Sequence, residues 1–174
     1  MGAGVTEAAT ATISSPCGPF TVLVDEGAVV ASGWTAEPAE LVAWLAPGRR
    51  PHTWAAGDDA GAGEAAAAYF AGRLDAIDDV AVSQRSGPFV QQAWAALRTA
   101  RPGAPLSYRQ LAAAAGRPGA ARAAGLACAT NAVALFVPCH RAVRGDGSLG
   151  GFRWGLAVKR WLLAHEAGTA GLDR

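Results

Sequence analysis

The chain has 174 residues, with 15 Lys and Arg against 14 Asp and Glu for a net charge of +1, and 51% of its residues are hydrophobic. This length and composition predict one ordinary domain or two small ones and exclude a disordered tail protein. No apolar stretch approaches the roughly 18 residues that a membrane span needs, so a membrane span is excluded.

The first half of the chain, residues 1–88, predicts a small mixed α/β unit. Its first nine residues have no periodicity, and we expect a frayed tail there. Two β-branched runs flank a short turn that contains glycine, which predicts a β-hairpin over 20–33. The remaining expected elements are a helix over 37–45, a loop over 46–63, a helix over 64–70 and a strand over 80–82.

The second half, residues 89–174, predicts a mostly helical domain. Its first helix is expected to be capped by Ser86, with Pro88 in its first turn, and to end at the Pro- and Gly-rich run 101–105. The last helix is expected from Leu156 to about residue 165.

Between these helices, the pattern is typical of a helix-turn-helix at about 107–128. Ser107 and Gln110 have the spacing of a capping box, which opens a helix that ends near Gly116. A second short helix follows over 120–128, and helix, Gly-containing turn, helix is the signature of this motif.

The second of these helices is built almost entirely of small residues, with Arg122 as its one long side chain. An alanine-rich core helix is one interpretation, although a core helix normally carries more than one large apolar residue to fill space. The alternative is that a smooth face lets the helix approach another backbone closely, where Arg122 can reach into it.

The balanced total charge hides a strong asymmetry between the two halves. Residues 1–88 hold four basic and eleven acidic residues, a net charge of −7, whereas residues 89–174 hold eleven basic and three acidic residues, a net charge of +8. A positive segment of this size is a plausible footprint for a polyanion. Attraction between the two halves across an internal interface is the alternative.

A thiol stands next to an imidazole in the motif Pro138-Cys139-His140-Arg141, after the short apolar run 135–137, which we expect to be a buried strand. An unperturbed thiol has a pKa near 8.5, and neighbouring His, Arg or backbone N–H groups would raise its ionised fraction. Cys139 is therefore a candidate nucleophile, with a structural thiol as the alternative. The scattered cysteines and histidines have no ligand spacing, so no metal site is predicted, and a reducing compartment is favoured.

The carboxylate of Glu166 comes at the end of the last predicted helix. A negative charge at a helix C-terminus opposes the helix dipole, so Glu166 needs another partner. An imidazole or an arginine would serve, and a solvated surface acid is the alternative.

These residues together resemble one family. The motifs Asn131-x5-Val137-Pro-Cys-His-Arg141 and Leu156-Ala-Val-Lys159-x-Trp-Leu-Leu-Ala-His-Glu166 resemble those of the O6-alkylguanine-DNA alkyltransferases, also called methylated-DNA–protein-cysteine methyltransferases. Phe89-x-x-Gln92-x-Trp94, Ser107-Tyr108-Arg-Gln-Leu-Ala112 and Ser15-Pro16-x-Gly18-Pro19 fit the same family in the same order. The resemblance covers nearly the whole chain and is strongest over 86–166.

The resemblance implies an α+β protein, with an RNase H-like α/β unit over 1–88 and a helical DNA-binding and alkyl-transfer domain over 89–174. It implies a repair protein that flips O6-alkylguanine, and also O4-alkylthymine, out of duplex DNA and moves the alkyl group irreversibly onto Cys139. The expected partner is double-stranded DNA, with no cofactor, no metal and no membrane. We expect a cytoplasmic monomer, nucleoid-associated in a bacterium, and leave cooperative assembly on DNA open.

The resemblance also implies roles for individual residues. Cys139 takes the acceptor role, His140 that of a water-mediated base, Glu166 orients the imidazole, and Asn131 braces the turn around the cysteine. The residues expected to contact DNA or the flipped base are Tyr108, Arg122, Arg141, Phe152 and Arg153, of which Arg122 would fill the gap left by the base. Phe152 stands where a tyrosine is frequent, and Arg153 where some members have a serine, so that only the backbone N–H of Arg153 would face the guanine oxygen.

Three other functions are compatible with parts of the pattern. A non-catalytic sensor of alkylated DNA with the same fold would lack the acceptor cysteine, which this chain has. A transcriptional regulator would need a dimerisation element or a base-reading helix, and the sequence indicates neither. A Cys-His hydrolase would turn over a small substrate instead of being labelled once.

Overall fold

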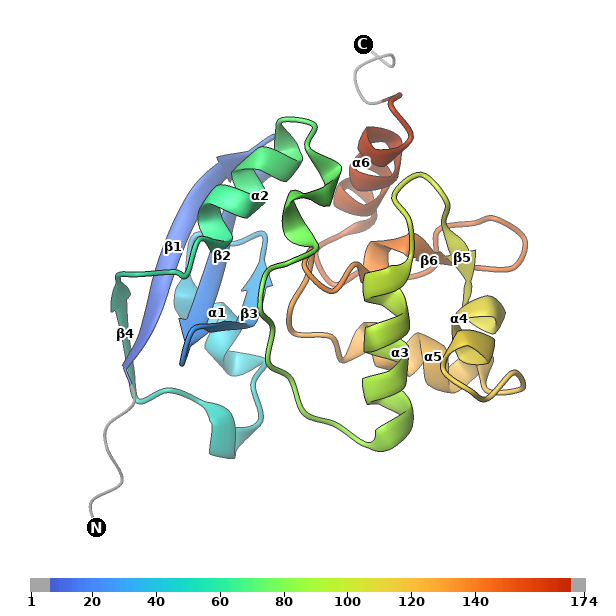
Figure 1. Cartoon of the computed structure of the whole chain (residues 1–174), viewed down its shortest axis with the longest axis horizontal. Coiled ribbons are helices and arrows are strands. Elements are labelled where there is room, and N and C mark those ends of the chain that lie inside the picture. Colours follow the sequence, from blue (N-terminus) through green and yellow to red (C-terminus); the bar gives the residue numbers. More distant parts are fainter. Residues whose placement is uncertain (1–6, 170–174) are drawn as a thin grey trace. The chain divides into compact units, whose positions relative to one another are not determined.

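A four-stranded sheet organises the first half of the chain in the computed structural model, which describes residues 7–169 (Figure 1). The sheet order is β3-β2-β1-β4, with antiparallel β1–β2 and β2–β3 pairs and a parallel β1–β4 pair. The elements are β1 (Glu7–Ser15), β2 (Gly18–Asp25), β3 (Ala28–Gly33), α1 (Pro38–Ala43), β4 (Thr53–Ala56) and α2 (Ala62–Phe70), with 3-10 turns at Pro47–Arg49 and Leu74–Ile77.

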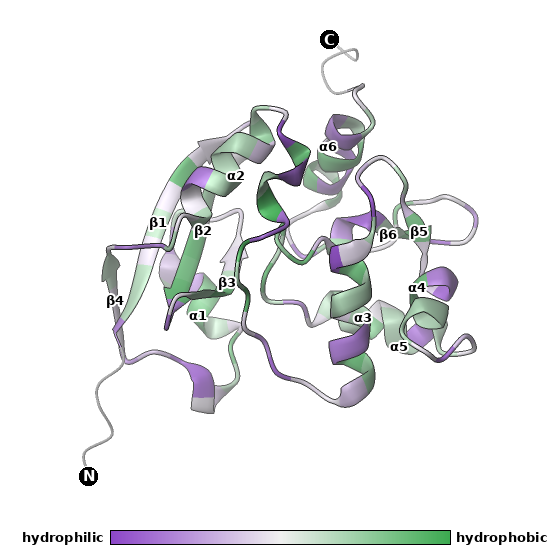
Figure 2. Cartoon of the chain, viewed as in Figure 1, coloured by the Kyte–Doolittle hydropathy of each residue, from purple (hydrophilic) through white to green (hydrophobic). Residues whose placement is uncertain are grey.

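The core of this sheet is centred on β2. Its successive residues from Phe20 to Val24 are all buried, so both faces of the strand are covered, and the strand is green in Figure 2. Helix α1 packs against β2 and β3, and α2 packs against β1 and β2. The ring of Phe20 lies 4.9 Å from that of Trp34, 5.7 Å from that of Phe70 and 6.2 Å from that of Phe136.

Two strands occupy positions where the sequence predicted none. β1 begins at Glu7, within the expected frayed tail, whose residues 1–6 lie outside the described residues. β4 lies in the expected loop 46–63. Both strands are rich in Ala and Thr, whose small side chains give little alternation of hydrophobicity, and they form because each pairs with a distant segment. The strand expected over 80–82 is only an isolated bridge between Val29 and Val82.

Helices dominate the second half of the chain, as predicted. The elements are α3 (Pro88–Thr99), β5 (Leu106–Ser107), α4 (Tyr108–Ala114), α5 (Ala121–Ala129), a 3-10 turn at Cys139–Arg141, β6 (Ala142–Val143) and α6 (Leu156–Glu166). The short strands β5 and β6 pair in parallel and were not predicted. Among residues 7–169, which the structure describes, no helix is long and apolar enough to cross a membrane.

The local sequence signals predicted for α4 are present in the structure, whereas the cap predicted for α3 is not. The capping box is confirmed, because the Ser107 hydroxyl accepts from the Gln110 N–H and the Gln110 side chain accepts from the Ser107 N–H. Gly116 has the expected left-handed backbone, with φ of +88°. The predicted cap of α3 is wrong: Gly87 is the N-cap and makes no side-chain bond, so Ser86 stands one residue too early.

The chain divides into two compact units, and one short segment crosses from the second half into the first unit. The first unit contains the described residues up to Gln84 together with Ala132–Phe136, and the second contains Arg85–Asn131 and the described residues from Val137 on. Ser32 holds this segment through two bonds, one from its N–H to the Ala132 carbonyl (2.9 Å) and one from its hydroxyl to the Ala134 carbonyl (2.7 Å). The run 135–137 is buried but is not a strand, since Leu135 has a φ of +76°.

We expect Ser32→Ala to lower the free energy of unfolding by about 1–2 kcal/mol, because the buried Ala134 carbonyl loses its hydroxyl donor. Urea unfolding followed by tryptophan fluorescence measures the change. Ser14→Ala is the matched control: Ser14 is exposed on β1, so its substitution should stay within about 0.5 kcal/mol of the wild type. Equal losses in both variants would contradict a specific contribution of the Ser32 hydroxyl.

Candidate functional site

A buried 3-10 turn carries the three candidate residues Cys139, His140 and Arg141. The turn is closed by bonds from the Cys139 N–H to the Val137 carbonyl (2.8 Å) and from the Arg141 N–H to the Pro138 carbonyl (3.0 Å). The side-chain amide of Asn131 also donates to the Val137 carbonyl, at 2.8 Å. Asn131, which follows the end of α5, is therefore tied to Val137, the residue before the turn.

The carboxylate of Glu166, at the end of α6, receives both kinds of partner that the sequence suggested. His140 Nε2 lies 2.6 Å from Glu166 Oε1. The guanidinium of Arg141 donates from Nε to both carboxylate oxygens (3.1 and 3.0 Å) and from Nη2 to Oε1 (2.9 Å), while Nη1 donates to the Ala100 carbonyl (2.7 Å). The three side chains form one buried network.

This network corrects the DNA-contacting role predicted for Arg141. The residue is only 1% exposed, and its guanidinium is directed to Glu166 and Ala100. A buried arginine whose donors neutralise a buried carboxylate has no charge to offer a phosphate. The sequence could not separate this arginine from surface ones, because its partner is 25 residues further along the chain.

The network also decides which nitrogen of His140 carries the proton. Burial by itself raises the pKa of Glu166, but hydrogen bonds from His140 and Arg141 lower this pKa to about 2. Glu166 is therefore an ionised carboxylate, which can only accept hydrogen bonds. Nε2 of His140 is therefore the donor. Burial lowers the pKa of His140, which keeps the imidazole neutral, and its Nδ1 has no hydrogen-bond partner among the described residues. A free lone pair at Nδ1 is what a general base requires.

The thiol of Cys139 is not activated at rest in the way that the sequence suggested. Burial raises its pKa, and this outweighs the opposing effects of the Asn131 amide and of the charges on Lys159 and Arg153. Cys139 is 7% exposed and makes no disulfide. A base would therefore have to remove this proton before the sulfur could act as a nucleophile.

Lys159 is a site residue to which sequence reasoning assigned no role. It is fully buried, and its ammonium donates to the carbonyls of Ala142 (2.7 Å) and Gly151 (3.3 Å) and lies 6.0 Å from the ring centre of Tyr108. Burial lowers its pKa and the nearby Cys139 raises it. A signal was present, because the buried face of α6 consists of Lys159, Leu162 and Glu166, which places a lysine at helical spacing among core positions.

A groove of about 850 Å³ lies beside α4 and α5 in the second unit. Tyr108 and Arg122, two of the five residues predicted to contact DNA or the flipped base, both line it. Three arginines face the groove, which makes it positively charged. The lining residues are Ser107, Tyr108, Arg109, Gln110, Ala121, Arg122, Gly125, Arg144 and Gly145.

The loop before α6 closes against Tyr108. A side-chain carbon placed on Gly150 would lie 2.5 Å from the Tyr108 hydroxyl oxygen, so only a glycine fits there. Phe152 is half-buried in this loop. The guanidinium of Arg153 donates to the carbonyls of Asn131 (2.9 Å) and Ala129 (2.6 Å), so the side chain is turned to the end of α5.

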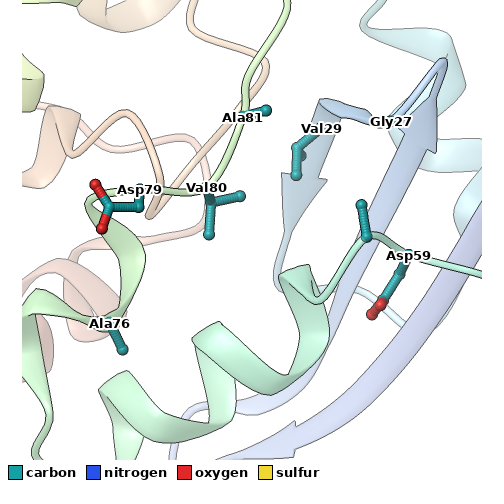
Figure 3. A pocket seen from close by; sticks show the side chains of 8 residues that line it. Gly27, Val29, Asp59, Ala76, Asp79, Val80 and Ala81 are labelled. Atoms are coloured by element: carbon teal, nitrogen blue, oxygen red, sulfur yellow. The ribbon is translucent and has the colours of Figure 1, made fainter.

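The first unit has a smaller cavity of about 300 Å³, between β3, the start of α2 and the segment 76–81 (Figure 3). It presents two carboxylates among small and apolar side chains. Asp59 accepts from the N–H groups of Gly61 and Gly63 and so serves the N-terminus of α2. Within residues 7–169, no group of three or more His, Cys, Asp or Glu residues could hold a metal ion.

Comparisons with known proteins agree with this geometry. A family model described as 6-O-methylguanine DNA methyltransferase, DNA binding domain, matches residues 88–168. A methylated-DNA–protein-cysteine methyltransferase from Mycobacterium tuberculosis is 40% identical over 162 residues, which cover 93% of this chain and 94% of that protein. The chain belongs to the methylated-DNA–protein-cysteine methyltransferase family.

Other members of the methyltransferase family show how far the similarity extends. A solved structure of Mycobacterium tuberculosis OGT in complex with DNA has a TM-score of 0.78 and 36% identity, and the match covers 94% of this chain and 96% of that one. The bifunctional transcriptional activator and DNA repair enzyme Ada of Escherichia coli is 54% identical over 83 residues. That match covers 48% of this chain, which spans only 23% of the longer Ada protein.

In this methyltransferase, we expect Glu166→Gln to lower the free energy of unfolding at pH 7 by about 3 kcal/mol, because the buried Arg141 charge loses its counter-charge. The depressed pKa of Glu166 contributes stability that is present above its ordinary value of 4.5 and is lost as the pH falls towards about 2. The difference between wild type and variant should therefore shrink between pH 4.5 and 2. Urea unfolding at pH 7, 5 and 3 measures it.

The exposed Glu37, which makes no side-chain capping bond, provides the control Glu37→Gln, and this variant should unfold like the wild type at each pH. A difference between wild type and Glu166→Gln that stays constant down to pH 2 would contradict the ionised state assigned to Glu166.

Proposed function

We propose that the chain repairs DNA by direct reversal, moving the alkyl group of O6-alkylguanine in duplex DNA onto the sulfur of Cys139. The observation that carries this proposal is the unpaired Nδ1 of His140. This residue directly follows the buried Cys139 in the chain, and its other ring nitrogen is bound to Glu166. O4-alkylthymine is a second substrate in the proposal. Family membership supports the reaction type, and the roles of individual residues rest on their chemistry.

In the proposed reaction, His140 takes the thiol proton through a water molecule, and the thiolate attacks the alkyl carbon in line with the C–O6 bond. A carbon–sulfur bond forms, the bond between the alkyl carbon and O6 breaks, and its electron pair leaves with the guanine. The guanine takes a proton from solvent water, and the imidazolium of His140 then returns its proton to the solvent. Glu166 stabilises the imidazolium that forms. The thioether has no route back to a thiol in this site, so each molecule acts once.

We propose that α4 and α5 act as a helix-turn-helix and that the groove with Arg109, Arg122 and Arg144 receives the DNA. The small residues of α5 allow a close approach to the minor groove, where base readout is degenerate, and this suits a protein that must find lesions in any sequence. Arg122, exposed on α5, enters the stack in place of the flipped base. Binding to phosphates by these arginines makes the affinity depend on salt.

Tyr108 and Phe152 line the place of the extruded base in this proposal, and the backbone N–H of Arg153 faces its O6 atom. We propose a cytoplasmic location and a monomer in solution. The alternative function is a non-catalytic sensor of alkylated DNA. The presence of Cys139 with a base beside it favours transfer over sensing.

The first test is a labelling experiment with a duplex that carries O6-methylguanine. We expect one methyl group per chain, located on Cys139 by peptide mass spectrometry, and no further repair after one equivalent. Cys139→Ser should bind DNA without transfer, whereas Cys17→Ser should transfer like the wild type, because Cys17 lies on the turn between β1 and β2, in the first unit. An unmodified Cys139 with an intact lesion would refute the proposal.

The second test separates base extrusion from chemistry. We expect Arg122→Ala to slow repair of O6-methylguanine in duplex DNA by about tenfold or more, since extrusion costs a few kcal/mol that an inserted side chain offsets. Reaction with free O6-benzylguanine needs no extrusion and should keep its rate. Single-turnover kinetics on both substrates measure this, and equal losses on both would contradict the base-replacement role of Arg122.

A further inference from the structure

The C-terminal end of α5 is held by side chains from two other parts of the second unit. The last carbonyls of a helix have no partner within it and need donors from elsewhere. The Ala127 carbonyl accepts from the indole N–H of Trp94 on α3 (2.9 Å), and the Ala129 carbonyl accepts from Nη2 of Arg153 (2.6 Å). A cation at this end of a helix also interacts favourably with the helix dipole. Arg153 is thus a cap of α5 that comes from the loop before α6.

The second bond of Arg153 reaches the turn that leads to the reactive thiol. Its Nη1 donates to the carbonyl of Asn131, whose side chain in turn holds the Val137 carbonyl at the start of the cysteine turn. One planar guanidinium therefore binds the carbonyls of Ala129 and Asn131 at once. A lysine would have to bring both carbonyls around a single nitrogen, whereas the two guanidinium nitrogens reach them separately in a fixed, planar geometry.

The loop that carries Arg153 packs against Tyr108, which lines the groove beside α4 and α5. Gly150 is packed against the Tyr108 hydroxyl, and the Gly151 carbonyl accepts from Lys159 at 3.3 Å. These contacts hold the loop near its beginning. Arg153 holds it further along, against the end of α5, which is the helix that bears Arg122.

We propose that Arg153 is a positioning residue. It clamps the loop 150–155 onto the C-terminal end of α5 and so keeps this loop, the Asn131 side chain and the helix that bears Arg122 in one geometry around the Cys139 turn. This role rests on the proposed function, and it differs from a direct contact between the guanidinium and DNA. A clamp of this kind makes the geometry of the Cys139 turn depend on α5, the helix that enters the DNA in the proposed function.

The charge of Arg153 adds an electrostatic consequence that the clamp alone would not have. The charges of Lys159 and Arg153 favour the thiolate of Cys139, whereas Cys128 of α5 and Tyr108 of α4 interact with it unfavourably once they are ionised. His140, the next residue, is neutral. Removal of the charge at position 153 should therefore move the ionisation of Cys139 to higher pH.

The experiment uses the full chain with Arg153→Lys, Arg153→Ser and, as the control, Arg160→Ser, which removes an exposed arginine from α6. Two rates are measured for each protein: alkyl transfer from free O6-benzylguanine, and alkylation of Cys139 by iodoacetamide as a function of pH, with the site identified by mass spectrometry. Thermal unfolding establishes that each variant is folded.

We expect Arg153→Lys to slow transfer by about tenfold while its iodoacetamide profile stays at the wild-type pH, because the charge remains and the two-carbonyl fork is lost. Arg153→Ser should slow transfer at least as much and displace the profile to higher pH. Arg160→Ser should change neither. If Arg153→Ser does not fold, the transfer rate of Arg153→Lys by itself tests the clamp.

Transfer by Arg153→Lys at the wild-type rate would overturn the clamp, and so would an Arg153→Ser variant with both measurements unchanged. The failure of the proposed function looks different. A wild-type chain that reacts with iodoacetamide but neither with O6-benzylguanine nor with O6-methylguanine in duplex DNA overturns alkyl transfer. The pH profile of Arg153→Ser then still tests the effect of Arg153 on the thiol.

Discussion

The buried network of His140, Glu166 and Arg141 is the constraint on which the reactive site depends. A carboxylate out of contact with water is costly unless its charge is matched and its oxygens accept hydrogen bonds. Here the guanidinium supplies the charge and the imidazole supplies one further N–H. Because the carboxylate stays ionised, it dictates the tautomer of the imidazole and leaves Nδ1 as the basic nitrogen. The same contacts fasten the end of α6 to the turn that carries Cys139. The bonds that fix the tautomer of His140 therefore also hold these two elements together.

Positive charge in the second half of the chain has two different uses. Arg109, Arg122 and Arg144 line the groove beside α4 and α5, where they are available to a polyanion. Arg141, Lys159 and Arg153 are instead turned inward, onto a carboxylate or onto backbone carbonyls. The net charge of +8 in this half therefore overstates what DNA can meet. The inward-facing charges act on the thiol and on the loop that surrounds it.

Burial explains why the thiol needs a base. An exposed cysteine near positive charges would be partly ionised and would react with many electrophiles. Cys139 is almost fully buried, which raises its pKa despite the nearby Lys159 and Arg153. In the proposed reaction, His140 takes this proton. A protein that can act once gains from a thiol that stays protonated until the correct substrate occupies the pocket.

Sequence patterns by themselves determined the local structure and the chemical groups of this protein. Helical spacing, the capping box at Ser107 and the turn glycine Gly116 act within a few residues, so they predicted α3, α4 and α5 closely. The need of Glu166 for a cationic or imidazole partner followed from its place at a helix end. Strands β1 and β4 escaped prediction, because small Ala and Thr side chains carry little pattern and the strands exist through pairing with distant segments.

Only the tertiary structure decided which charges are buried and what they contact. Arg141, Arg153 and Lys159 look alike in the sequence as basic residues near a cysteine, and packing gave each a different partner. It also assigned residues 132–136 to the first unit, although they stand just before the cysteine turn. The physical reason is that desolvation and long-range hydrogen bonds depend on which surfaces meet in three dimensions, whereas caps, turns and helical faces depend on neighbours along the chain.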